Sequence, residues 1–194
     1  MKNLTGTAIL NAVVISLLSF PLLAQDVEQR LLIRNATVID GTGAPARGPV
    51  DIVVEGGVIT DIVDADLIGI GRVGGRPEVE EGTRVIEAEG MYALPGFIDM
   101  HTHIPGENSP WGPDYAYKLF LAHGITTVRD AGSFSGFEAL KRHRQESEEG
   151  SRIAPRIFAY RAMFAGSLTP DSARELVRQY REEGADGIKL SGVY

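Results

Sequence analysis

The sequence of 194 residues contains no cysteine, so it can form neither a disulfide framework nor a thiolate metal site. Any bound metal ion must therefore be held by nitrogen and oxygen ligands. Basic residues are outnumbered: 19 lysines and arginines face 26 aspartates and glutamates, which gives a formal net charge of −7. The basic residues are scattered rather than clustered. This pattern argues against a nucleic-acid partner, which usually requires a basic patch.

The N-terminus has few charges before Asp26, where Lys2 is the single charged side chain. An apolar run follows from Ala8 to Ala24, and the small Ala24 precedes the polar stretch "QDVEQR". This layout is typical of a secretory signal peptide at residues 1–24. We therefore expect an exported protein, periplasmic or secreted, with no stable membrane insertion after cleavage. The alternative is an uncleaved anchor, for which the run is slightly short.

Residues 25–95 are rich in β signals. "LLIRNATVID" is a predicted strand, and "VDIVVEGGVITDIV" reads as a hairpin, because paired glycines supply the positive φ that tight hairpin turns require. "RVIEAEG" and "MYAL" are two more short predicted strands. The sequence thus predicts a small β-sandwich segment in this region.

Residues 96–194 change to alternating strands and helices. The strands are predicted at "FIDMHTH", "ITTVRD", "RIFAY" and "GIKLS", with helices between them. In the third helix, Thr169 is the expected N-cap and Pro170 the first helical residue. Repeated strand–helix units predict an α/β fold with a parallel sheet or barrel. A closed (β/α)8 barrel needs about 250 residues, so the four predicted strands of this region could form at most the first half of one.

The motif "GFIDMHTHIPG" holds two of the four histidines of the chain. Alternate strand residues face opposite sides, so His101 and His103 share a face with Phe97 and Asp99. Ile98, Met100, Thr102 and Ile104 form the opposite face, which we expect to pack under helices. Residues two apart on a strand have Cα atoms about 6.6 Å apart, so two imidazoles can converge on one ion. The alternative is that both are ordinary polar residues at a strand end.

Lys189 shows the same parity in "GIKLS", where Ile188 and Leu190 take the opposite face. Lys189 should therefore point into the barrel lumen, where an unpaired lysine is costly. Its neutral amine could react with carbon dioxide to give a carbamate that bridges two metal ions. By position alone, an ion pair with Asp130 or Asp186 is the simpler interpretation.

Three other residues have open roles. Asp130 ends the second barrel strand and could lie at the active-site mouth, or it could form a structural ion pair or a helix cap. His123 sits at a predicted helix end, where an imidazole suits the helix dipole, and we interpret it as structural. His143 lies in a charged helical stretch and is predicted to be solvated.

Taken together, these segments resemble the amidohydrolase superfamily. The resemblance is carried, in order, by "LLIRNATVIDGTG", "DIVVEGGVITDI", "VIEAEGMYALPGFIDMHTH", "GITTVRDAG" and "GADGIKL", and it spans residues 31–190. The branch that these motifs most resemble contains imidazolonepropionase-like and Xaa-Pro dipeptidase-like enzymes.

The resemblance implies a metal-dependent hydrolase of amide, peptide or cyclic amide bonds, acting on a small-molecule or dipeptide substrate. It implies that His101 and His103 are metal ligands and that Lys189 is a carbamylated, bridging ligand. One or two divalent ions are implied, most often zinc, although manganese, iron or cobalt suit the same ligands.

The family also uses histidines from the fifth and sixth barrel strands and a catalytic aspartate from the eighth. The four strands predicted here carry none of these. The sequence therefore predicts the N-terminal portion of such an enzyme, inactive by itself. The alternative is a non-catalytic half-barrel protein whose site is completed by a second chain.

Overall fold

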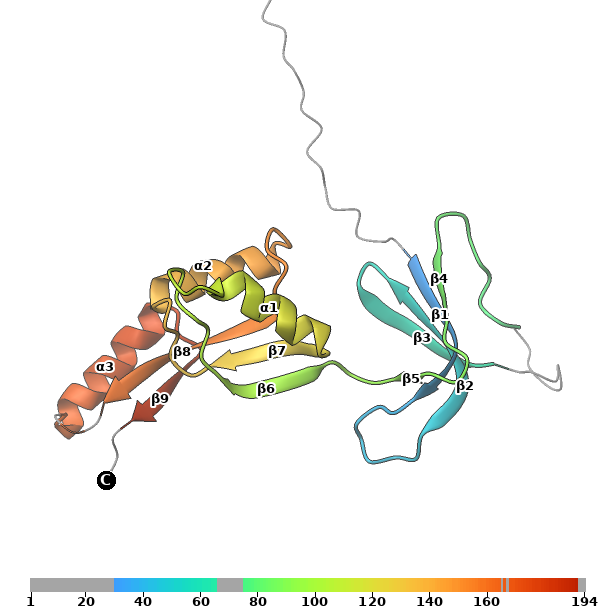
Figure 1. The fold of residues 1–194 in the computed structure, drawn as a ribbon. Coiled ribbons are helices and arrows are strands. Elements are labelled where there is room, and N and C mark those ends of the chain that lie inside the picture. Colours follow the sequence, from blue (N-terminus) through green and yellow to red (C-terminus); the bar gives the residue numbers. More distant parts are fainter. Residues whose placement is uncertain (1–29, 66–74, 165, 167, 192–194) are drawn as a thin grey trace, which may run out of the picture.

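The computed structural model describes residues 30–65, 75–164, 166 and 168–191, so the predicted signal peptide at residues 1–24 lies outside the described part of the chain. The described residues form two separate sheets (Figure 1). One sheet lies in the N-terminal half of the chain and the other in the C-terminal half. A short extended link after residue 93 joins them (Figure 1).

The N-terminal sheet is mixed. The order of its main strands is β3-β2-β1-β4, and β5 pairs with β1 beyond β4. β1 is antiparallel to β2 but parallel to β4 and β5. The predicted hairpin is confirmed, since Gly56 and Gly57 connect β2 to β3 with φ values of 56° and 80°. The strands are β1 (Arg30–Val38), β2 (Arg47–Glu55), β3 (Val58–Asp64), β4 (Arg84–Glu87) and β5 (Tyr92–Ala93).

The C-terminal sheet is parallel throughout, with its four strands in sequence order β6-β7-β8-β9. It curls as half of a barrel, which confirms the predicted partial (β/α)8 architecture (Figure 1). The strands are β6 (Phe97–Thr102), β7 (Ile125–Asp130), β8 (Arg156–Phe164) and β9 (Gly187–Ser191). The helices between them are α1 (Gly112–Ala122), α2 (Phe137–Glu148) and α3 (Pro170–Glu182).

The core of the half-barrel lies between its sheet and the first two helices. Val128 of β7 and Ile157 of β8 pack against Tyr117 of α1 and Leu140 of α2, and Ile104 completes the cluster. All five side chains are fully or almost fully buried. This core fixes which face of each strand points to the helices, and the opposite face is left to form the lumen.

The outer strand β6 follows the predicted alternation only at its C-terminal end. Thr102 and Ile104 are buried, as expected for the face beneath the helices. Ile98 and Met100 share that face but are 60% and 54% exposed, so the prediction that they are packed is wrong for the described residues. Among those residues β6 pairs with β7 alone, so its other edge has no neighbouring strand.

Helix α3 begins as predicted. Thr169 is its N-cap, with its hydroxyl accepting a hydrogen bond from the Ser172 backbone N–H at 3.2 Å, and Pro170 is its first residue. The Ser172 hydroxyl in turn accepts from the Thr169 N–H at 2.9 Å, which completes a reciprocal capping box. In the described part of the chain, no helix is both long and apolar enough to cross a membrane.

Candidate metal centre

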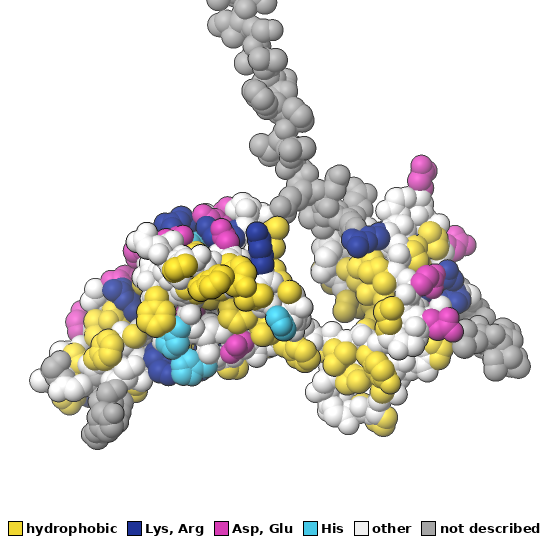
Figure 2. Space-filling view, in the orientation of Figure 1, with side chains coloured by type: hydrophobic (Ala, Val, Ile, Leu, Met, Phe, Trp, Pro, Cys, Tyr) yellow, Lys and Arg dark blue, Asp and Glu magenta, His cyan; other side chains and the backbone are white. Residues whose placement is uncertain are grey.

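The two histidines of β6 and its C-terminal extension converge. The Nε2 atoms of His101 and His103 are 3.3 Å apart, and their ring centroids are 5.2 Å apart. Two nitrogen ligands that bind zinc at about 2.05 Å with a tetrahedral angle are themselves about 3.3 Å apart. The spacing of the two imidazoles therefore fits a shared divalent ion. Both residues are exposed on the sheet face opposite the helices, and Figure 2 shows histidine side chains gathered beside a basic side chain on the half-barrel.

A hydrogen bond to a backbone carbonyl determines which ring nitrogen of His103 is free to bind an ion. The His103 Nδ1 atom lies 2.8 Å from the carbonyl oxygen of Gly132, so Nδ1–H donates this bond. That tautomer leaves a lone pair on His103 Nε2, the atom that faces His101. A ligating histidine usually donates its second ring N–H to a carbonyl or carboxylate in this way.

Lys189 of β9 reaches the same place from the far edge of the sheet. Its Nζ atom is 3.3 Å from His101 Nε2. Asp186, one of the two acids considered as an ion-pair partner of Lys189, instead accepts hydrogen bonds from Arg144 and from the Ala159 N–H, each at 2.7 Å. The structure therefore brings together His101, His103 and Lys189, each of which strand parity placed on the lumen face.

Asp130 lies in the buried layer beneath the helices, not on the exposed lumen face. Its side chain is fully buried, and it lies on the same face of β7 as Val128, which belongs to the core beneath the helices. Its two carboxylate oxygens accept hydrogen bonds from the backbone N–H groups of Ile104 and Gly132, each at 2.8 Å. Burial raises the pKa of Asp130, although these two N–H groups act to lower it. Among the residues that the structure describes, Asp130 has no ion-pair partner and caps no helix.

The described residues do not supply a complete metal site of the usual side chains. Within ranges 30–65, 75–164 and 168–191, no group of three or more histidine, aspartate or glutamate side chains could hold a metal ion. Asp99 lies on the lumen face of β6, and its carboxylate accepts a hydrogen bond from the His101 backbone N–H at 3.0 Å. The two imidazoles and the lysine are thus the ligand-capable groups that the described strands bring together.

The other two histidines lie outside this centre. His123 caps the C-terminus of α1, where its Nδ1 lies 2.8 Å from the Leu119 carbonyl oxygen, in keeping with the structural role predicted. His143 is fully buried, so the prediction that it is solvated is wrong. It lies three residues after Leu140, on the helix face that packs against α1. The charged residues next to His143 in the sequence led to the wrong prediction, because they gave no sign of a buried helix face.

Three side chains connect through His143 in a way that the sequence did not reveal. The Tyr117 hydroxyl lies 3.0 Å from His143 Nδ1, and His143 Nε2 lies 2.8 Å from Glu107 Oε1. Burial lowers the pKa of His143 and raises the pKa of the Tyr117 phenol. The neutral imidazole therefore accepts from Tyr117 and donates to Glu107. This relay holds the β6–α1 loop against α2.

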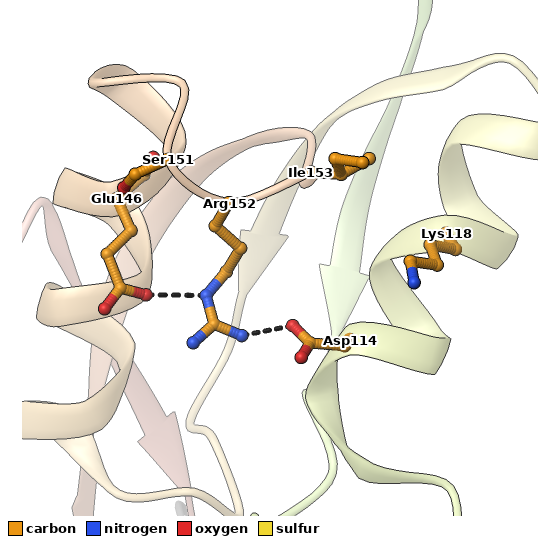
Figure 3. A pocket seen from close by; sticks show the side chains of 6 residues that line it. All are labelled: Asp114, Lys118, Glu146, Ser151, Arg152 and Ile153. Carbon is orange, nitrogen blue, oxygen red and sulfur yellow. Dashed lines mark hydrogen bonds and ion pairs between the residues drawn. The ribbon is translucent and has the colours of Figure 1, made fainter. Parts of the chain in front are cut away.

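A surface hollow between α1 and α2 is separate from the histidine pair (Figure 3). Arg152 lies at its centre and forms ion pairs with Asp114 of α1 and Glu146 of α2, so its guanidinium is already neutralised. The lining residues are Asp114, Lys118, Glu146, Ser151, Arg152 and Ile153. None of these residues belongs to the lumen face. The ion pairs of Arg152 join α1 to α2 beside the hollow, which is a structural role.

The sequence profile of the amidohydrolase family matches residues 92–193, which is more than half of the chain. The chain belongs to the amidohydrolase family. The matched region contains the whole parallel sheet and all three residues of the candidate metal centre.

Two curated relatives illustrate the range of the family. An adenine deaminase from Methylobacterium sp. (strain 4-46) is 43% identical over 89 residues, covering 42% of this chain and 15% of that protein. A dihydroorotase from Thermoanaerobacter sp. (strain X514) is 43% identical over 101 residues, covering 51% of this chain and 20% of that protein. The chain thus spans a fifth or less of the length of these relatives.

Solved structures share the fold. A candidate prolidase from Bifidobacterium longum superposes with a TM-score of 0.70 at 22% identity, covering 86% of this chain and 42% of that one. A molinate hydrolase superposes with a TM-score of 0.66 at 21% identity, covering 84% and 45%. These likenesses include the N-terminal sheet as well as the half-barrel, and they establish that the fold is that of a partial amidohydrolase.

Proposed function

We propose that this chain supplies the first ligands of a divalent metal centre in a hydrolase of carbon–nitrogen bonds. The observation that carries the proposal is the 3.3 Å separation of His101 Nε2 and His103 Nε2, on the lumen face at the C-terminal end of the first barrel strand. Barrel enzymes place their chemistry at that end. Membership of the amidohydrolase family supports the same reaction class.

In this proposal His101 and His103 bind the ion through their Nε2 atoms. Lys189 is the third ligand, held as a carbamate that forms when its neutral amine adds to carbon dioxide and releases a proton. When bound, a divalent ion supplies Lewis-acid activation of water and of the substrate carbonyl. Zinc is our first choice of ion because its preferred nitrogen and oxygen ligands and tetrahedral angle fit this donor set.

We propose a small-molecule substrate with an amide, dipeptide or cyclic amide bond. The relatives bear names as different as adenine deaminase and dihydroorotase, and the structural neighbours include prolidases. The reaction that these names share is the cleavage of a carbon–nitrogen bond. The imidazolonepropionase-like and Xaa-Pro dipeptidase-like branch remains our prediction from the motifs.

We further propose that the 194-residue polypeptide hydrolyses nothing by itself. Catalysis requires a base near the ion, and the aspartates of β6 and β7, Asp99 and Asp130, both accept hydrogen bonds from backbone N–H groups. The export predicted from residues 1–24 is likewise a proposal. Mass spectrometry of the protein recovered from the periplasm or medium tests it, with cleavage near Ala24 as the expected result.

The metal proposal is tested with cobalt(II) as a spectroscopic probe and zinc as a competitor. We expect a cobalt absorption spectrum that zinc abolishes, and a loss of affinity greater than about 100-fold in His101→Ala and His103→Ala. His123→Ala is the matched control, because His123 is exposed and its ring bonds to the Leu119 carbonyl of α1, away from the histidine pair. Equal cobalt binding by all four proteins would refute the proposal.

Turnover is assayed separately on Xaa-Pro dipeptides and cyclic amides, with zinc present. We expect none from the 194-residue polypeptide. Strong hydrolysis that a chelator abolishes would contradict the proposed inactivity while supporting the reaction class. Hydrolysis that arises only when a second polypeptide is added would favour the complementation alternative.

A further inference from the structure

A fully buried carboxylate lies directly behind the candidate metal ligand His103. Asp130 Oδ2 accepts a hydrogen bond from the Ile104 N–H, and Asp130 Oδ1 accepts one from the Gly132 N–H, both at 2.8 Å. We propose that Asp130 is a positioning residue that sets the orientation and the tautomer of His103 through these two backbone groups. The inference rests on the proposed function, because it assigns His103 as a ligand.

The two backbone groups hold His103 from both sides. Ile104 follows His103 directly, so its N–H belongs to the peptide unit that carries the imidazole. Gly132 provides the carbonyl oxygen that lies 2.8 Å from His103 Nδ1. One carboxylate therefore fixes both the backbone that bears the ring and the acceptor to which the ring is bonded.

The conformation of Gly132 makes this connection possible. Its φ is +119°, in the region that favours glycine, and an added Cβ would lie 3.3 Å from the Ala162 Cβ. In this conformation the N–H of Gly132 points to Asp130 while its carbonyl oxygen points to His103. A flexible glycine would not hold that direction alone, so the hydrogen bond that the Gly132 N–H donates to Asp130 supplies the constraint.

Further backbone bonds tie the same two segments together. The Ala131 N–H donates to the Thr102 carbonyl at 2.9 Å, and the Phe134 N–H donates to the Ile104 carbonyl at 3.0 Å. These hydrogen bonds align the two segments, but neither involves the His103 imidazole or the carbonyl oxygen of Gly132. Asp130 is the side chain in the described structure that links the two groups controlling the His103 ring.

The chemical consequence concerns the free nitrogen. With a proton held on Nδ1 by Gly132, His103 keeps a lone pair on Nε2, the atom that faces His101. Loss of the constraint would allow the other tautomer, whose Nε2–H cannot bind an ion. Residues that orient ligating histidines typically contribute about 10- to 100-fold in metal affinity.

The test is made on the 194-residue polypeptide without metal, labelled with 15N-histidine. Long-range 1H–15N spectra report which ring nitrogen carries the proton, and the His103 signals are assigned by their loss in His103→Gln. We expect the Nδ1–H tautomer in the wild type and a mixture of tautomers in Asp130→Asn and Asp130→Ala. In Asp130→Asn the amide NH2 faces a backbone N–H, so one of the two bonds is lost without a change of size.

A matched control comes from the other sheet. Asp51 is also fully buried and also accepts a backbone N–H, from Asn35 at 3.0 Å. We expect Asp51→Asn to leave the His103 tautomer unchanged. Zinc affinity, measured by competition with a chromophoric chelator, should fall at least about 10-fold in Asp130→Asn and stay unchanged in Asp51→Asn.

An Nε2–H tautomer in the wild type would overturn the inference, and this measurement needs no variant of Asp130, so it decides even where Asp130→Ala fails to fold. Unchanged tautomer and zinc affinity in a folded Asp130→Asn would overturn it as well. If the wild type binds no zinc but its tautomer still depends on Asp130, the proposed function fails and the positioning role stands. If the wild type binds zinc and neither the binding nor the tautomer depends on Asp130, the proposed function stands and the positioning role fails.

Discussion

The Nζ atom of Lys189 lies 3.3 Å from the Nε2 atom of His101, although 88 residues separate the two in the sequence. β6 and β9 are the two outer strands of the curled parallel sheet, and the lumen faces of both strands lead to this contact. The carbamylation that we propose for Lys189 can be tested at this contact.

Lys189 should make metal binding depend on bicarbonate. We expect bicarbonate to increase the zinc affinity of the wild-type chain, because a carbamate adds two oxygen ligands beside His101. Lys189→Arg keeps the positive charge but cannot form a carbamate in this way, so its zinc affinity should not respond. Titrations at matched ionic strength, with and without bicarbonate, give the comparison. An equal response in both proteins would contradict carbamylation.

The buried His143 should make stability depend on pH. Burial lowers its pKa in the folded state, so below the unfolded-state value of about 6.5 the unfolded chain binds more protons. The free energy of unfolding should therefore fall as pH decreases through and below this value, by up to about 1.4 kcal/mol per pH unit. Urea denaturation at pH 5.5, 6.5 and 7.5 (chosen values, roughly spanning that titration) measures the slope.

The slope, not the absolute stability, identifies His143. His143→Gln retains a donor and an acceptor for Glu107 and Tyr117 but cannot titrate, and its slope should be smaller. His123→Gln, which changes an exposed imidazole, should keep the wild-type slope. A steep slope that survives in His143→Gln would assign the effect to other groups.

The pair of Asp51 and Arg76 should contribute strongly to the stability of the N-terminal sheet. Asp51 is fully buried, and Arg76 Nε donates to it at 2.7 Å. Burial acts to raise the pKa of Asp51, but the hydrogen bonds from Arg76 and from the Asn35 N–H hold it below its ordinary value. Arg76→Ala would leave a buried carboxylate unpaired, and we expect it to cost about 3 kcal/mol.

Arg47→Ala is the control for that prediction. Arg47 and Asp64 also form an ion pair, but their side chains are 54% and 53% exposed. Exposed pairs contribute about 0–1 kcal/mol, so this substitution should change stability little. Similar losses in the two variants, measured by urea denaturation, would show that burial is not the deciding factor.

The N-cap of α3 gives a smaller effect. Thr169→Ala removes the hydroxyl that accepts the Ser172 N–H, and we expect a loss of about 1 kcal/mol. Thr169→Ser keeps the hydroxyl and should remain within a few tenths of the wild type, by roughly the same scale. If both variants lose equal stability, the methyl group of Thr169 rather than its cap is responsible.

Much of the site could be predicted because it follows from local geometry. A strand places alternate side chains on opposite faces, so the shared face of His101 and His103 was determined by a spacing of two residues. The same parity predicted the direction of Lys189. The turn at Gly56 and Gly57 and the cap at Thr169 were likewise predicted from short segments whose conformation depends on a few neighbouring residues.

Other features depended on contacts between distant segments. No pattern in the sequence distinguishes an ion pair, a cap or the active-site mouth for Asp130, because its partners Ile104 and Gly132 are set by strand pairing between β6 and β7. His143 was predicted to be solvated because its neighbours in α2 are charged, and its burial depends on where α1 packs. The exposure of Ile98 and Met100 depends on which elements cover β6.

Short-range periodicity and ordered motifs are enough to predict the strand–helix alternation, the lumen face of each candidate ligand and the family. The contact of Lys189 with His101 and the place of Asp130 behind His103 depend on the folded sheet. The physical reason is that hydrogen bonds and burial join residues far apart in the chain, and their partners exist only once the sheet has curled.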